Sequence, residues 1–260
     1  MEFLTIGSAT HVGMKKQENQ DYHAWHLPEK SSRKGILLAL ADGMGGRYGG
    51  STASKIAVDV LIETYYKDMS HSISESLEKA FHKANEEVIA KGRTDINLAG
   101  MASTLTAVVL KPDRMYYAHV GDSRGYIIHK NEIKQFTEDH SYVADLVRAG
   151  QIKEEEAETH PERNIITRAI GLESKLRVDA PAEAQTIKKD QYILLCCDGL
   201  HGVVSNEEIV NAVYEYKEPE LICEKLVEKA NEHGGPDNIT VLIARVDRIG
   251  LMSRIMNLVR

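Results

Sequence analysis

ILLALADG, residues 36–43, is an apolar run that stops at an aspartate followed by a glycine. Six consecutive apolar residues are typical of a strand buried on both faces. Three further carboxylates stand beside strand-length apolar runs: Asp198 after residues 192–197, Asp122 after residues 117–121, and Asp237 before residues 239–246. We therefore expect four aspartates at the ends of buried strands.

Strand-length apolar runs come in clusters and do not alternate strictly with helices. They cover residues 36–41, 105–110, 115–120, 125–129, 192–197 and 239–246. Several are joined by turns of a few residues, which is typical of antiparallel hairpins. Helical periodicity of apolar residues marks residues 53–65, 73–88, 207–213 and 220–230. The pattern predicts an α+β fold with antiparallel sheets covered by helices, and it disfavours a doubly wound parallel sheet.

Composition limits the functional classes. The chain has 260 residues, 42% of them hydrophobic, so it can bury a sizeable core and wholesale disorder is excluded. Its 32 Lys and Arg against 39 Asp and Glu give a net charge of −7, which argues against a nucleic-acid binder. With three cysteines, no signal peptide and no membrane-length apolar stretch, a cytoplasmic protein is expected.

Clustered carboxylates at the edge of a core need a compensating cation. Oxygen ligands select Mg²⁺, Mn²⁺ or Ca²⁺ over zinc, and two such ions can hold a nucleophilic water against a phosphoryl group. An isolated Asp-Gly is most often a turn, but four sites at matching positions weaken that interpretation. The glycine-rich residues 43–50 lack the Gly-Lys-Ser/Thr of a nucleotide loop, so phosphate binding of that type is not expected. Glycines would instead allow a main-chain carbonyl to reach a metal, which makes Gly43 a candidate ligand through its carbonyl.

Together with further short motifs, these residues resemble the metal-dependent protein phosphatases of type 2C in their compact bacterial form. The matching elements, in the order of the family, are Gly13 with Asn19-Gln20-Asp21, Asp42-Gly43-Met44-Gly45-Gly46, Ser103-Thr104-Leu105-Thr106, Gly121-Asp122-Ser123-Arg124, Asp139-His140-Ser141, His160-Pro161 with Asn164, Thr167-Arg168-Ala169-Ile170-Gly171, Asp198-Gly199-Leu200, and Gly235-Pro236-Asp237-Asn238-Ile239-Thr240. They extend over residues 5–246. A set this long and ordered is specific, although no single member is.

The resemblance implies a four-layer α-β-β-α sandwich with two central antiparallel β-sheets flanked by helices. It implies one catalytic domain, residues 1–247, with a flap at residues 141–165. Composition alone would instead favour a solvent-exposed surface segment there. It also implies two Mn²⁺ or Mg²⁺ ions per active site, with a weaker third. The corresponding residues are Asp42 bridging both ions, Gly43 through its carbonyl, Asp198 and Asp237 on the other ion, Asp122 with Asp198 for the third, and Asp21 through water, with Asn238, Gly121 and Ser123 in support.

The activity that the resemblance implies is hydrolysis of phosphoserine and phosphothreonine in proteins. A water bridging the metals and held by Asp42 would attack phosphorus directly, without a phosphoenzyme. Phosphorylated proteins would be the substrates, a bacterial-type Ser/Thr kinase the opposing partner, and the chain a monomer. The cysteines fit no nucleophilic role and are expected in the core.

Two positions depart from the family pattern. Lys16 stands where many members have a phosphate-binding Arg; it keeps the charge but loses the bidentate fork, and the sequence leaves open whether Lys15 or Lys16 faces the cleft. Met44 replaces a His that is proposed as general acid in eukaryotic members. His119, His140, His160 and His201 lie in or near the motifs, but each is more often structural than catalytic.

Two alternatives and the C-terminal tail complete the expectations. A non-catalytic metal-binding signalling module is disfavoured because every metal position holds an acidic residue. A phosphatase for an anti-anti-sigma-type partner is disfavoured because no fused sensor domain is visible. Residues 248–260 form a basic amphipathic pattern that is expected to pack on the domain or fray, with membrane contact as the minor alternative.

Overall fold

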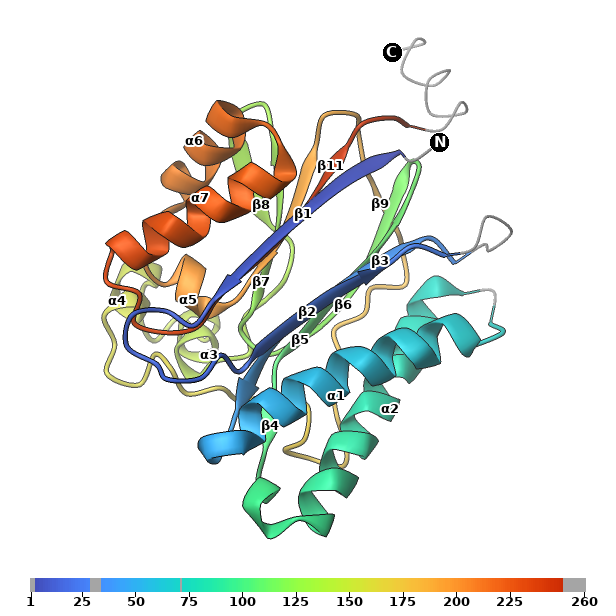
Figure 1. Cartoon of the computed structure of the whole chain (residues 1–260), viewed down its shortest axis with the longest axis vertical. Coiled ribbons are helices and arrows are strands. Elements are labelled where there is room, and N and C mark those ends of the chain that lie inside the picture. Colours follow the sequence, from blue (N-terminus) through green and yellow to red (C-terminus); the bar gives the residue numbers. More distant parts are fainter. Residues whose placement is uncertain (1–2, 29–33, 71, 250–260) are drawn as a thin grey trace.

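Two antiparallel sheets lie face to face in the computed structural model, which describes residues 3–28, 34–70 and 72–249 (Figure 1). In spatial order, one sheet consists of β1 (Leu4–His11), β11 (Ile239–Val246), β10 (Tyr192–Cys196), β7 (Arg124–His129) and β8 (Glu132–Gln135). The other consists of β2 (Asp21–His26), β3 (Ile36–Met44), β5 (Leu105–Lys111), β6 (Arg114–Val120) and β9 (Gln185–Thr186), with β4 (Ala102–Ser103) also paired to β3.

Helices cover the outer face of each sheet. Helices α1 (Gly46–Lys67) and α2 (Ile73–Thr94) pack on the sheet that contains β3, whereas α6 (Asn206–Tyr216) and α7 (Pro219–Glu232) pack on the sheet that contains β10 (Figure 1). The shorter helices are η1 (Ile96–Leu98), α3 (Tyr142–Arg148), α4 (Glu154–Glu158) and α5 (Asp198–His201). The predicted α+β class and four-layer α-β-β-α arrangement are confirmed.

The apolar run of β3 is continuous because both faces of the strand are buried. Leu37 and Ala39 face α1 and α2, while Leu38 and Leu40 face the other sheet, and all four are fully buried. Each buried leucine contributes about 2 kcal/mol of transfer free energy. Side-chain alternation likewise sends Cys196 toward the α6–α7 layer and Cys197 between the sheets. The sheet holding Asp42 is thus fixed on both sides by apolar packing.

The prediction that Asp42 follows the end of its strand is wrong. Strand β3 continues to Met44, because Gly43 pairs with Ser103 and Met44 with Ala102 of β4. Asp42 therefore lies inside a strand, at the end of the β2–β3 pairing. Gly43 is required there, since a Cβ atom would stand 2.0 Å from the carbonyl oxygen of Gly50.

The segment suggested as a flap, residues 141–165, contains α3, α4 and connecting loops. Its base is closed by an antiparallel bridge between Ser141 and Ile166, and the Thr167 N–H donates to the His140 carbonyl at 2.8 Å. Its function stays a prediction.

Of the C-terminal tail, Ile249 packs against the core between the sheets, and residues 250–260 lie outside the described residues. Within the described part of the chain, no helix has the length and apolarity needed to cross a bilayer.

Candidate metal centre

Five aspartates from both sheets converge at one end of the sandwich. Asp21 and Asp42 are directly paired across β2 and β3, and their carboxylates lie with the Cys197 thiol in a group whose candidate ligand atoms are within 4.8 Å of one another. The remaining three aspartates are Asp198 at the start of α5, Asp237 just before β11, and Asp122 just after β6. Burial, followed by the charges of the other four aspartates, raises the pKa of Asp42 well above its ordinary value.

The backbone of Asp42 is held by the segment that leads into β5. Its N–H donates to Thr104 Oγ1, while its carbonyl accepts from the Thr104 N–H and from Ser103 Oγ, all at 2.8 Å. The Thr104 hydroxyl also lies 2.7 Å from Ser123 Oγ, which ties β3 to the loop of Asp122. These hydrogen bonds fix the backbone of Asp42 and do not use its carboxylate.

Asp21 has one carboxylate oxygen satisfied and one without a partner. Thr240 Oγ1 donates to Asp21 Oδ2 at 2.6 Å, whereas the buried Oδ1 accepts no hydrogen bond from the described residues. Burial raises the pKa of Asp21 to about 7, assisted by the charges of Asp198 and Asp237 and opposed by the hydrogen bond from Thr240.

Asp198 and Asp122 also have a carboxylate oxygen without a hydrogen-bond partner among the described residues. In each, this oxygen is the buried Oδ1 atom. Burial and the charge of Asp237 raise the pKa of Asp198, and burial and the charge of Asp198 raise the pKa of Asp122 to about 7. The carbonyl of Asp122 accepts from His201 Nε2 at 3.0 Å, which fixes its backbone.

These orphaned oxygens fit a hard divalent cation. Three buried carboxylate oxygens lack partners among the described residues, and the charges of their aspartates repel one another. A cation would relieve both the unmet hydrogen-bonding capacity and the repulsion. The aspartates supply oxygen ligands of the kind that Mn²⁺ and Mg²⁺ prefer. Burial raises the pKa of the Cys197 thiol well above its ordinary value, so that sulfur stays protonated and unsuited as a ligand.

Asn238 fastens the loop of residues 12–20 to the metal centre. Its Nδ2 donates to the carbonyls of Val12 and Glu18, and its Oδ1 accepts from the Gln20 N–H, each at 2.9 Å. The Asn238 N–H also donates to Asp237 Oδ1 at 2.8 Å. Asn238 thus connects this loop, through its side chain, to a predicted metal ligand, which it contacts through its backbone N–H.

Lys16 stands on that loop and forms an ion pair with Asp237, its Nζ lying 2.7 Å from Oδ1. The lysine side chain is 48% exposed. Partial burial lowers the pKa of Lys16, but the hydrogen bond to Asp237 and the charges of Asp237, Asp198 and Asp42 raise it overall. Of the two adjacent lysines, the structure therefore brings Lys16 to the carboxylates.

Of the four histidines near the motifs, His119, His140 and His201 are structural groups whose ring nitrogens contact backbone groups beside the metal centre. The role of His160 stays a prediction. His119 and His140 are fully buried, and burial lowers the pKa of His119 to about 4 and that of His201 to about 3. His119 Nε2 lies 3.0 Å from the Gly121 carbonyl, and His140 Nδ1 accepts from the Gly121 N–H. Gly121, predicted as a supporting residue, is thus held between two neutral imidazoles.

Sequence reasoning missed the hydroxyl groups that position the aspartates. Thr104 and Thr240 each contact an aspartate of the centre, and both lie within the quoted motifs. It also missed the ion pair between Arg124 and Asp139, whose Nη2 and Oδ2 atoms are 2.8 Å apart. The signal for these residues was a polar side chain inside or beside an apolar strand, where burial requires a partner.

Comparison with known proteins shows similarity along nearly the whole chain. A family model described as protein phosphatase 2C matches residues 10–229. Protein phosphatase PhpP of Streptococcus pneumoniae is 36% identical over 247 residues, which are 94% of this chain and 98% of that protein. The crystal structure of the serine/threonine phosphatase Stp1 from Staphylococcus aureus is 30% identical, with a TM-score of 0.87, and the match covers 95% of this chain and 96% of that one.

A second solved structure contains metal. The catalytic domain of the serine/threonine protein phosphatase PstP, in complex with two manganese ions, is 32% identical, with a TM-score of 0.79. The match covers 94% of this chain and 98% of that one.

Proposed function

Because the chain belongs to the protein phosphatase 2C family and is a metal-dependent protein-serine/threonine phosphatase, we propose that it works through a binuclear Mn²⁺ or Mg²⁺ centre built on Asp42, Asp198 and Asp237. The strongest support in this chain is Asp198 Oδ1, which is buried and has no partner among the described residues, next to the similarly unpartnered Oδ1 atoms of Asp21 and Asp122. A protein that folds around such oxygens retains them for a ligand, since each costs about 1–3 kcal/mol when left unpaired.

Each residue of the centre has a proposed role. Asp42 would be shared by the two ions, the Gly43 carbonyl would hold one of them, and Asp198 and Asp237 would hold the other. Asp122 and Asp198 would hold a weaker third ion, and Asp21 would orient water. When bound, the ions supply a water nucleophile of lowered pKa and neutralise charge on the phosphoryl oxygens.

The surrounding residues position the carboxylates and the phosphate. Lys16 contributes a mobile cation, because its ion pair with Asp237 is half-exposed and therefore weak enough to exchange for a phosphoryl oxygen. Asn238 keeps the Lys16 loop next to Asp237, while Gly121 and Ser123 fix the turn of Asp122. Buried imidazoles of lowered pKa are poor proton donors near neutral pH, so His119 and His201 take no part in acid catalysis.

The biological setting is also proposed. Phosphorylated proteins are the substrates, a Ser/Thr protein kinase is the opposing enzyme, and the protein acts as a cytoplasmic monomer. The catalytic domain comprises residues 1–247, and the flap, residues 141–165, influences substrate access. Three buried free cysteines are compatible with a reducing compartment.

Phosphate release tests the proposal. We expect Mn²⁺-dependent turnover of p-nitrophenyl phosphate and of phosphothreonine peptides, lost in Asp42→Asn and in Asp198→Asn and retained in the surface control Asp59→Asn. Absence of turnover at saturating Mn²⁺ contradicts the proposal. If calorimetry then showed Mn²⁺ binding, the non-catalytic metal-binding module would become the better interpretation.

A further inference from the structure

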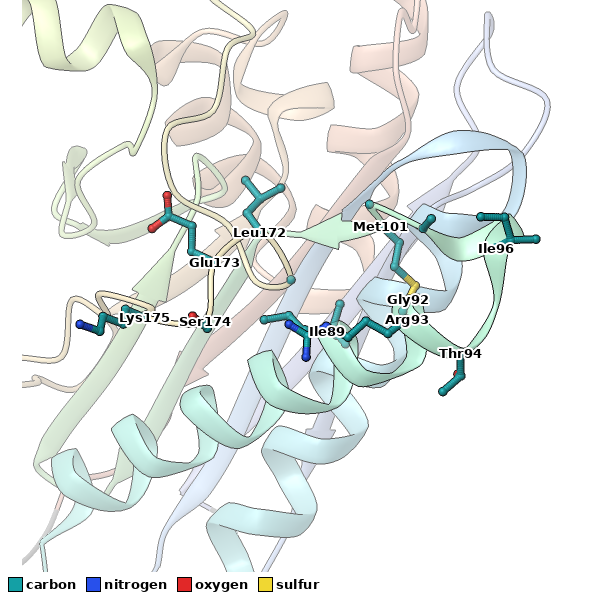
Figure 2. A pocket seen from close by; sticks show the side chains of 14 residues that line it. Ile89, Gly92, Arg93, Thr94, Ile96, Met101, Leu172, Glu173, Ser174 and Lys175 are labelled. Atoms are coloured by element: carbon teal, nitrogen blue, oxygen red, sulfur yellow. The ribbon is translucent and has the colours of Figure 1, made fainter.

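A pocket of about 1200 Å³ lies where the end of α2 meets the loop that follows the suggested flap (Figure 2). Its walls are residues 88–101 on one side and residues 171–175 on the other. Ile96 and Leu172 line it and are 87% and 52% exposed. Large apolar side chains that stand in solvent beside a concavity are typical of a binding surface.

The loop that forms one wall is held in place by a buried amide. Asn85 accepts from the Gly171 N–H through Oδ1 at 2.7 Å and donates to the Glu173 carbonyl through Nδ2 at 2.8 Å. Asn85 is 2% exposed. The concavity is therefore preformed, and a ligand would not have to order this loop.

The pocket carries a positive charge although the whole chain is acidic. Arg93 and Lys175 line it together with one carboxylate, Glu173, in a chain of net charge −7. Within the described residues, neither Arg93 nor Lys175 takes part in an ion pair, so both charges are available to a ligand. The chemistry favours an occupant that combines an apolar side chain with a carboxylate.

The pocket adjoins the strand that carries the metal centre. Met101 lines it and immediately precedes β4, whose two residues pair with Met44 and Gly43. A Cβ atom on Gly45 would lie 3.0 Å from Met101 Cα, so the pocket wall packs on the turn after the predicted ligands. The β3–β4 register continues to place Met101 opposite Gly45, so two residues at about 3.3 Å each and one inter-strand step of about 5 Å put Met101 roughly 8 Å from Gly43, which a few extended residues can span.

We propose that this pocket docks the protein substrate through an acidic segment that carries an apolar side chain and lies a few residues from the phosphorylated residue. The apolar side chain packs against the exposed Leu172 and Ile96, and a carboxylate pairs with Arg93 or Lys175. The inference rests on the proposed function, because the same polypeptide must present its phosphoryl group to the metal centre. It adds a determinant of substrate choice outside that centre.

Peptide kinetics with the full chain and Mn²⁺ test the docking site. The substrates are p-nitrophenyl phosphate and two phosphothreonine peptides with the same core, one extended on both sides by segments containing Leu and Glu, the other by Ser and Gln. We expect kcat/KM to be about tenfold higher for the Leu/Glu peptide, as is usual for one apolar side chain in a pocket. The ratio should fall to about one in Leu172→Ser and in Lys175→Glu.

Matched controls separate docking from folding and from chemistry. Met69→Ser, at a side chain that is 89% exposed, and Lys130→Glu, on the β7–β8 turn, should keep the tenfold ratio. All four variants should turn over p-nitrophenyl phosphate like the parent, and an unphosphorylated Leu/Glu peptide should inhibit only the Leu/Glu substrate. Equal kcat/KM for both peptides in the parent, or an unchanged ratio in the pocket variants, overturns the docking site. Failure to hydrolyse p-nitrophenyl phosphate would instead contradict the proposed function.

Discussion

Asp21 and Asp42 stand directly opposite each other on neighbouring antiparallel strands, a pairing that places two carboxylates together in a buried position. Like charges at directly opposed positions destabilise a sheet by up to about 1 kcal/mol, and more where solvent is excluded. The sheet tolerates them here because Thr240 satisfies one oxygen of Asp21 and the apolar layers on both sides fix β3. The paired aspartates thus lower the stability of this part of the sheet and at the same time provide a cation site.

The first prediction concerns metal and stability. In metal-free protein, Asp42→Asn should raise the free energy of unfolding by about 1 kcal/mol, because a neutral amide replaces a buried acid whose ionisation opposite Asp21 is unfavourable. The parent should gain about 2.7 kcal/mol when Mn²⁺ is added at a hundredfold excess over its Kd, and the variant should gain much less. Urea unfolding with and without Mn²⁺ measures both effects. Asp59→Asn is the control, and equal metal stabilisation in Asp42→Asn would contradict this assignment.

The second prediction concerns pH in the metal-free protein. The pKa of Asp21 is about 7 in the folded state and about 3.9 when unfolded, so the folded state binds more protons between these values. The contribution of Asp21 to stability is therefore fully present below pH 4 and is lost as the pH rises toward 7. The free energy of unfolding should decline less steeply over this range in Asp21→Asn than in the parent. An identical slope in both proteins would show that Asp21 is ionised throughout.

Much of the fold could be predicted because its core strands are apolar on both faces. The runs at residues 36–41, 105–110 and 239–246 appear as β3, β5 and β11. Strands β1 and β2 were missed because they are half-exposed and carry Gly7, Ser8 and Thr10 or two histidines where an apolar alternation was sought. Their place depends on pairing with β11 and β3, which local sequence does not encode.

The acidic residues of the candidate site could be predicted from the sequence, but most of the residues that position them could not. Asp42, Asp198, Asp237 and Asp122 stood out because each interrupts an apolar context. Spatial pairing decides the rest: Asp21 faces Asp42 only through strand register, and Lys16 reaches Asp237 because Asn238 holds its loop. The docking pocket is lined by two segments about 75 positions apart in the sequence, so no single stretch of sequence could indicate it.

The third prediction uses the buried imidazole of His119. Burial lowers its pKa to about 4, whereas an unfolded His titrates near 6.5, so the unfolded state binds more protons between these values. The stability contributed by neutral His119 is present above pH 6.5 and is lost as the pH falls toward 4, by about 2 kcal/mol at pH 5. His119→Gln should show a shallower acid decline of the free energy of unfolding than the parent, as measured by urea unfolding at a series of pH values. A parallel decline in His119→Gln would contradict the prediction.

The fourth prediction concerns Asn85, whose side-chain amide holds the loop that contains Gly171 and Glu173. Asn85→Ala should lower the free energy of unfolding by about 2 kcal/mol, because it leaves the Gly171 N–H and the Glu173 carbonyl without their partner. It should also reduce the preference for the Leu/Glu peptide, since the loop would no longer be preformed, and leave kcat for p-nitrophenyl phosphate unchanged. Asn97→Ala, at an exposed amide, is the control. A cost below about 0.5 kcal/mol would show that this amide is dispensable.

The last prediction separates the roles of two adjacent lysines. Lys16 lies 2.7 Å from Asp237, whereas Lys15 is exposed and makes no ion pair with the described residues. If Lys16 transfers its charge from Asp237 to the substrate, Lys16→Met should raise KM for p-nitrophenyl phosphate about tenfold with little change in kcat. Lys16→Arg should retain or lower KM, because a guanidinium offers two parallel hydrogen bonds to a phosphoryl group. Lys15→Met should resemble the parent, and equal increases of KM in both Met variants would mean that the lysines act through general electrostatic attraction.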